Sequence, residues 1–220
     1  MNVDFEPSKL GTKEYWDEFY QEELNNYMDN NNDHGEVWFG ISSAAKMVNW
    51  IITFINDPSQ QPLLRFIEIG CGNGHLLNSL YDKGFRNLIG IDYSEHAIDL
   101  AQSIASQLQQ DIEFKALDLF NNSKTYHQLF DFVLDKGTFD AISLSKGNKE
   151  SIRSYRDAVA GLLSTNGVFL LTSCNWTQEE LLDLFGASFD CIDRIQHPVF
   201  SFGGVQGQAI TTLAFRLKAI

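Results

Sequence analysis

The sequence predicts an α/β fold in which helices cover both faces of a mostly parallel, seven-stranded sheet. One observation is that apolar runs alternate with amphipathic stretches from about residue 63 to residue 186. This alternation is typical of strand–helix–strand units, whose strands lie parallel. The other observation is that a short glycine-rich connection joins the last two β-rich runs. Such a connection predicts an antiparallel hairpin at the C-terminal edge of the sheet.

Five apolar runs predict the parallel strands. The first is continuous and ends at a glycine, as expected for a strand that is covered on both faces. The five runs are residues 63–69, 87–93, 112–119, 130–137 and 167–175. The two runs of the hairpin are residues 189–200 and 208–218, joined by the sequence SFGGVQG.

Apolar periodicity and capping residues predict the helices. Ser94 is an N-cap residue for one of them, and we expect another to stop at Asn166 and Gly167. The helices that follow strands are expected over residues 74–84, 94–110, 148–167 and 177–186. Two more are expected before the sheet, over residues 15–24 and 43–55, on either side of a loop.

Length and composition predict one folded domain, residues 1–220. We expect residues 1–60 to form an N-terminal helical segment that covers the ligand and substrate site, and residues 61–220 to form the sheet core. The net charge of −13 works against binding to nucleic acid, which needs clustered Lys and Arg. An acidic surface favours basic partners instead.

The sequence carries no apparent targeting or membrane segment. The N-terminus lacks the basic and apolar regions of a signal peptide, and no apolar run is long enough to span a bilayer. Cys71, Cys174 and Cys191 lie far apart, without the spacing of a zinc site. We therefore expect a cytoplasmic protein with reduced thiols, no bound metal and no membrane partner, and we expect it to be a monomer.

Three glycines on alternate positions follow the first strand. They are Gly70, Gly72 and Gly74, with Cys71 between the first two. A dinucleotide-binding loop places its third glycine one position later. Glu68, near the end of the strand, would repel a pyrophosphate but would attract a ligand with an ammonium or sulfonium group. The loop therefore indicates S-adenosylmethionine rather than a dinucleotide.

Acidic residues also end the second and third strands. Asp92, followed by Tyr93, is placed to accept hydrogen bonds from ribose hydroxyls, or alternatively to cap the next helix. Asp118 and Leu119 fit the place where a carboxylate meets the adenine amino group and an apolar side chain covers the ring. Because open α/β sheets bind ligands beyond the carboxyl ends of their strands, we expect these residues to line one crevice.

The fourth strand ends in the motif DKGTFDA, residues 135–141. This motif resembles that of class I methyltransferases that modify lysine in translation elongation factor 1-alpha, although Phe139 stands where many relatives have leucine. The resemblance extends from about residue 8 to residue 217 through the stretches SKLGTKEYWDEFYQEEL, EVWFG and LTSCNWT.

The resemblance implies a Rossmann-like class I fold, S-adenosylmethionine as cofactor and methylation of a lysine side chain on elongation factor 1-alpha. It implies that Trp16 and Asp135 join the loop and strand-end residues at the cofactor. It also implies a slot for the target lysine, formed by Trp38, Phe39, Asn175 and Trp176.

Alternatives stay open at several of these positions. Asp135 would accept the proton of the target lysine, or it would only bind the cofactor or cap the next segment. Trp38 and Trp176 would line the slot or belong to the core. The alternative function is a small-molecule N- or O-methyltransferase, and a further one is a non-catalytic binding module. The short path from the fifth strand into the next helix leaves the site open enough for a protein substrate.

Overall fold

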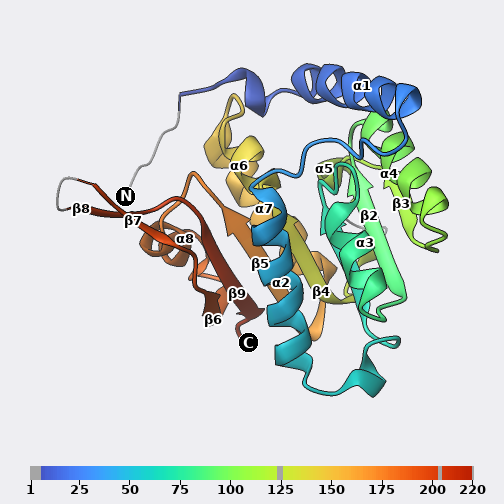
Figure 1. Cartoon of the computed structure of the whole chain (residues 1–220). Helices are drawn as coiled ribbons and strands as arrows, with labels where there is room; N and C mark the ends of the chain where they lie inside the picture. Colours follow the sequence, from blue (N-terminus) through green and yellow to red (C-terminus); the bar gives the residue numbers. More distant parts are fainter. Residues whose placement is uncertain (1–5, 123–125, 203–204, 220) are drawn as a thin grey trace.

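The structure is a computed structural model that describes residues 6–122, 126–202 and 205–219. Its main sheet has seven strands in the order β3-β2-β1-β4-β5-β9-β6 (Figure 1). The strands from β3 to β5 are parallel, and β9 runs antiparallel to both β5 and β6. The bounds are β1 Arg65–Ile69, β2 Asn87–Asp92, β3 Glu113–Ala116, β4 Phe130–Lys136, β5 Leu163–Ser173, β6 Phe189–Ile195 and β9 Thr211–Leu217. This confirms the predicted fold class.

Helices cover both faces of the sheet. On one face, α6, α7 and α8 pack a core rich in aromatic side chains against the strands. On the other face, α2, α3 and α4 pack mainly aliphatic side chains. The α-helices are α1 Lys13–Asp29, α2 Gly40–Ile55, α3 His75–Asp82, α4 Glu95–Gln107, α5 Leu119–Asn122, α6 Thr138–Ser143, α7 Asn148–Leu162 and α8 Gln178–Phe185. The 3-10 helices are η1 Lys9–Gly11 and η2 Pro58–Gln60.

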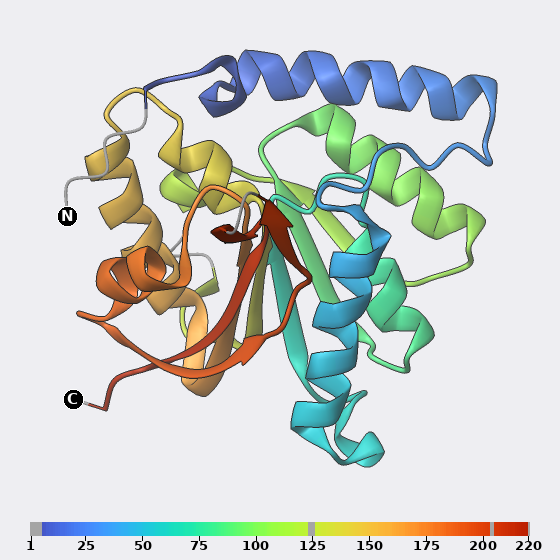
Figure 2. The ribbon, with the colours of Figure 1, turned by 60° about the vertical axis from the view of Figure 1, so that its left-hand side comes forward.

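The N-terminal helix α1 lies across the carboxyl ends of the parallel strands (Figure 2). It packs on α4 through Tyr20 and Tyr27, which meet the aliphatic side chains of Leu100 and Ile104. The Tyr27 hydroxyl also donates to Gln107 at 2.7 Å. These contacts hold α1 over the end of the sheet where the predicted ligand residues lie. Among the described residues, no helix has both the length and the apolar character needed to span a membrane.

The helix predicted over residues 148–167 is wrong at its C-terminal end. α7 ends at Leu162 and β5 begins at Leu163, so Asn166 and Gly167 lie inside a strand. β5 pairs with β4 on both sides of a register shift. Strand pairing, a long-range interaction, has therefore overridden the local Asn-Gly stop signal.

The predicted hairpin is present as β6 and β9, but its connection is wrong. The run over residues 189–200 leaves the sheet at Ile195, and Pro198, which has no N–H to donate to a ladder, follows. β7 Val199–Phe202 and β8 Val205–Gln208 then form a separate antiparallel pair. Residues 203–204 of the predicted turn lie outside the described residues. The third strand is also shorter than predicted, and the short helices α5 and α6 were not predicted.

Candidate active site

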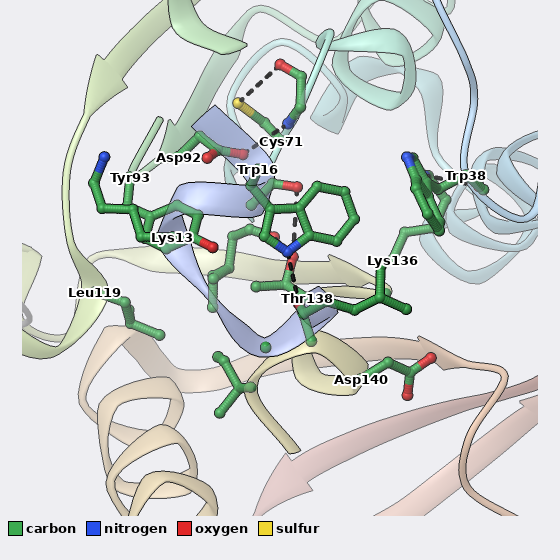
Figure 3. A pocket seen from close by; sticks show the side chains of 18 of the residues that line it. Lys13, Trp16, Trp38, Cys71, Asp92, Tyr93, Leu119, Lys136, Thr138 and Asp140 are labelled. Atoms are coloured by element: carbon green, nitrogen blue, oxygen red, sulfur yellow. Dashed lines mark hydrogen bonds between the residues drawn. The ribbon is translucent and has the colours of Figure 1, made fainter. Parts of the chain in front are cut away.

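A cavity of about 430 Å³ opens at the carboxyl ends of β1, β2 and β4 (Figure 3). Its wall combines the glycine loop after β1, the end of β2, the start of α5, the turn into α6, and α1 from above. The predicted site residues in this wall are Trp16, Trp38, Phe39, Gly70, Cys71, Gly72, Asp92, Tyr93, Asp118, Leu119 and Asn175. Within the described part of the chain, the wall leaves out Glu68, Gly74, Asp135 and Trp176.

The glycine loop is closely packed at all three of its glycines, most tightly at Gly70 and Gly72. Gly70 and Gly72 have φ angles of 62° and 53°, which L side chains rarely adopt. A Cβ atom on Gly70 would lie 2.0 Å from the Thr138 hydroxyl oxygen, and one on Gly72 would lie 2.3 Å from that of Tyr20. The loop thus has neither the backbone conformation nor the space for a side chain at these positions.

Glu68 lies beneath this loop and is 2% exposed. Its Oε2 atom has no hydrogen-bond partner among the described residues. Burial raises the pKa of Glu68 to about 8, against the opposing positive charge of Lys136. The position therefore holds a buried acid that is mostly protonated at neutral pH and that a nearby positive charge would ionise.

Asp92 joins the loop to the second strand. Its Oδ2 atom accepts from the Gly72 N–H at 3.1 Å, and its Oδ1 atom accepts from the Ser94 N–H at 3.0 Å. Ser94 is the N-cap residue of α4, as predicted, although its side chain makes no capping bond within the described residues. Burial raises the pKa of Asp92 to about 6, although these hydrogen bonds oppose the shift.

The opposite side of the cavity is formed by the segment after β3. The Asp118 carboxylate accepts from the Phe120 N–H at 2.9 Å and from the Asn121 amide at 2.7 Å, so it starts the short helix α5. Leu119 is buried beside it and contributes to the core below the cavity. The polar and apolar members of this pair therefore both lie in the cavity wall.

The structure places Asp135 in the core and not in the cavity wall. Its fully buried carboxylate accepts from the N–H groups of Thr138 and Phe139, at 2.9 and 3.0 Å, and from the Tyr155 hydroxyl. Burial raises its pKa to about 7. The arrangement is that of a cap on α6, which was one of the alternatives open from the sequence.

The aromatic residues divide between cavity and core. Trp16 donates its indole N–H to the Leu10 carbonyl at 2.7 Å, and its ring lies 5.0 Å from that of Trp38. Trp176 is 3% exposed and packs against Phe139 with ring centroids 5.7 Å apart. Trp176 thus belongs to the core, which was the alternative given for it.

Sequence reasoning missed many residues of the cavity wall, among them four side chains from α1 and the DKGTFDA motif. Lys136 and Asp140 lie in the same DKGTFDA motif as Asp135, and Thr138 lies between them. Tyr20 comes from α1. The motif itself was the signal that could have found the first three. These residues are Tyr20, Lys136, Thr138 and Asp140.

Comparisons with known proteins agree with this geometry. The family described as "Methyltransferase domain" matches residues 60–212. The chain is 41% identical to EEF1A lysine methyltransferase 2 of Danio rerio, over 97% of this chain and 90% of that protein. It is 41% identical to protein-lysine N-methyltransferase EFM4 of Saccharomyces cerevisiae, over 97% of this chain and 96% of that protein. Magnesium protoporphyrin IX methyltransferase from Synechocystis, solved with bound S-adenosylmethionine, shares the fold with a TM-score of 0.58 and 16% identity, over 91% of this chain and 97% of that one.

Fold, cavity and comparisons define a class I methyltransferase whose cofactor is S-adenosylmethionine, as the sequence predicted. The chain belongs to the family of protein-lysine N-methyltransferases that includes EEF1A lysine methyltransferase 2 and EFM4.

The residues that line the cavity are compatible with this cofactor. Gly70 and Gly72 line the cavity, so a bound ligand can contact the backbone of the loop there. Glu68, with one oxygen unpaired among the described residues, is a buried acid whose ionised form a bound cationic ligand would stabilise. The wall is mainly apolar, with a few polar groups, as in other small-molecule sites.

Proposed function

We propose that this enzyme transfers a methyl group from S-adenosylmethionine to the ε-amine of a lysine in translation elongation factor 1-alpha. The observation that carries the proposal is 41% identity over almost the whole of two proteins, one of which is named for this activity. Trp38 and Asn175, two residues predicted for the lysine slot, line the same cavity as the predicted cofactor residues, which is consistent with this proposal.

The cavity residues hold the cofactor in this proposal. Cys71 and its flanking glycines supply the floor, Asp92 and Tyr93 the ribose side, and Asp118 with Leu119 the adenine side. Trp16 covers the ligand from α1. The bound cofactor supplies an electrophilic methyl group on a sulfonium ion. Glu68 favours that charge from below the loop.

The remaining task of the chain is to align a neutral lysine amine with the cofactor. A free lysine has a pKa of about 10.4, so its ammonium must lose a proton first. When the lysine side chain enters the slot between Trp38 and Phe39, its ammonium loses water and its pKa falls. Asp135 was expected to accept the lysine proton, but it does not line the cavity. Within the DKGTFDA motif, the carboxylate that lines the cavity is that of Asp140. We assign Asp135 the capping role.

The chain acts as one unit in this proposal, with residues 1–60 as the cover of the site and residues 61–220 as the sheet core. The cover contributes Leu10, Trp16 and Tyr20 to the wall. We further propose a monomeric, cytoplasmic enzyme whose partner is the protein substrate and not nucleic acid or a membrane. The net charge of −13 supports a basic partner.

The test incubates the purified enzyme with tritiated S-adenosylmethionine and purified elongation factor 1-alpha, then identifies labelled peptides by mass spectrometry. Label on a single lysine is expected. Gly72→Ala should abolish it, because the new Cβ would meet the Tyr20 hydroxyl. Gly147→Ala is the matched control, since Gly147 also has a positive φ but has open space around it. No label from an enzyme that binds the cofactor in calorimetry would discard this substrate.

A further inference from the structure

Residues 34–39, which we call the strap, connect α1 to α2 over the glycine loop. Side chains from the cofactor site hold the strap by its backbone carbonyls. The Asn73 amide donates to His34 O at 2.9 Å and to Glu36 O at 3.1 Å. The Lys136 ammonium donates to Trp38 O at 3.1 Å (Figure 3). Asn73 follows Gly72 in the loop, and Lys136 ends β4, so both attachments come from elements that surround the cofactor.

The end of the strap has a backbone conformation that needs support. Phe39 has a φ of 64°, in the left-handed region that a bulky residue rarely adopts, and Gly40 follows with a φ of 77°. The Phe39 ring lies over Gly137, where an added Cβ would be 3.0 Å from the ring. Such conformations persist only where the surroundings fix them, and they cluster at active sites.

Lys136 is suited to provide that support. Burial lowers the pKa of its ammonium, while the negative charges of Glu68 and Asp135 oppose the shift. One oxygen of the Glu68 carboxyl has no hydrogen-bond partner among the described residues. Glu68 therefore interacts with Lys136 through charge and not through a hydrogen bond that would orient the ammonium. The ammonium donates its hydrogen bond to Trp38 O.

The side chain of Trp38 also points to a ligand. Its indole N–H is buried and has no partner in the part of the chain that the structure describes, although the residue lines the cavity. Buried donors are nearly always paired. A polar group of an incoming substrate would supply the missing acceptor, which places the strap on the substrate side of the cavity.

We propose that Lys136 is a positioning residue for the protein substrate. Through the Trp38 carbonyl it fixes Trp38 and Phe39 as the roof over the entering lysine, with Asn73 as the second attachment of the strap. The inference rests on the proposed function. It predicts that Lys136 contributes to kcat/KM for the protein substrate and not to the binding affinity for the cofactor.

The test compares Lys136→Met and Lys136→Arg with the wild-type enzyme. For Lys136→Met we expect kcat/KM for elongation factor 1-alpha to fall roughly 10- to 100-fold, as for loss of one hydrogen bond from a charged donor. The dissociation constant of S-adenosylmethionine, measured by calorimetry, should change far less. Lys136→Arg, which keeps the charge and donors, should recover part of the loss. Lys115→Met is the matched control, because Lys115 pairs with Glu113 and Tyr126 outside the cavity.

Amide hydrogen exchange gives a readout that general destabilisation would not reproduce. Faster exchange confined to the strap and the start of α2 is expected in Lys136→Met, with the sheet unchanged. Equal losses in cofactor affinity and kcat/KM, or uniformly faster exchange, would overturn the proposal and make Lys136 a cofactor ligand or a partner of Glu68. A wild-type enzyme inactive on elongation factor 1-alpha would overturn the proposed function instead. In that case the exchange arm still decides whether Lys136 holds the strap.

Discussion

At the scale of single residues, Glu68 shows how a side chain outside a cavity contributes to it. Its carboxyl is buried beneath the loop, with one oxygen unpaired among the described residues. Burial costs the ionised form its hydration, and this raises the pKa to about 8. A positive charge bound above the loop would reverse that shift, because an opposite charge favours the ionised carboxylate.

This coupling predicts a pH-dependent preference for a cationic ligand. S-adenosylmethionine carries a sulfonium and S-adenosylhomocysteine a neutral thioether, while their other ionisable groups are shared. As pH rises through 8, Glu68 ionises in the free enzyme. The preference for S-adenosylmethionine should therefore increase, by about tenfold for one unit of pKa shift. Calorimetry with both ligands between pH 6.5 and 9 measures it. Glu68→Gln should make the ratio independent of pH; a flat ratio in the wild-type enzyme would contradict this account.

At the scale of elements, Asp135 joins β4 to α6 and α7. Its carboxylate accepts from two N–H groups at the start of α6 and from the Tyr155 hydroxyl of α7. The helix α6 has only six residues, so it depends on such tertiary bonds and not on its own propensity. This carboxylate thereby sets the position of Thr138 and Asp140, which line the cavity.

Removing this carboxylate should therefore act on stability first. Asp135→Ala leaves three donors unpaired, two of them buried and one part-buried, and we expect a loss of about 3 kcal/mol or more in the free energy of unfolding, since each unmet buried donor costs about 1–3 kcal/mol. Tyr155→Phe removes one partner and should cost about 1 kcal/mol. Urea unfolding measures both. An Asp135→Ala enzyme with wild-type stability and no turnover would restore Asp135 as the proton acceptor.

At the scale of the whole molecule, the parallel sheet gathers buried acids at one end. Burial raises the pKa of Asp92 to about 6, that of Asp135 to about 7 and that of Glu68 to about 8. The unfolded chain releases the same protons near pH 4. Between these limits the folded state holds more protons than the unfolded state, so the free energy of unfolding falls as pH rises.

The enzyme without cofactor should consequently be more stable at mildly acidic pH. We expect the melting temperature to be lower at pH 8 than at pH 5.5 by roughly 5 °C, which is one to three kcal/mol for a chain of this size. Differential scanning calorimetry in matched ionic strength checks it. Glu68→Gln should reduce the difference, since it removes the acid with the highest pKa of the three. A melting temperature that rises from pH 5.5 to 8 would contradict the direction.

The sequence by itself determined the order of strands and helices, the glycine loop and the acidic strand ends. Those features are local, since periodicity marks the elements and topology brings the carboxyl ends of parallel strands together. The sequence therefore predicted that Gly70, Asp92 and Asp118 lie together, and all three line the cavity. The end of α7 was not predicted correctly, because it depends on the pairing of β5 with β4, which are distant in sequence.

Only the tertiary structure decided which residue of the DKGTFDA motif faces the cavity. Successive side chains of a strand point to opposite faces, so Asp135 and Lys136 cannot both face the same side. The sequence shows the alternation but not which face the cavity occupies. Packing of α6 and α7 places Asp135 in the core and leaves Lys136 beside the strap. The residue types predicted the chemistry of the site. Which side chains face the cavity depended on how elements distant in sequence pack together.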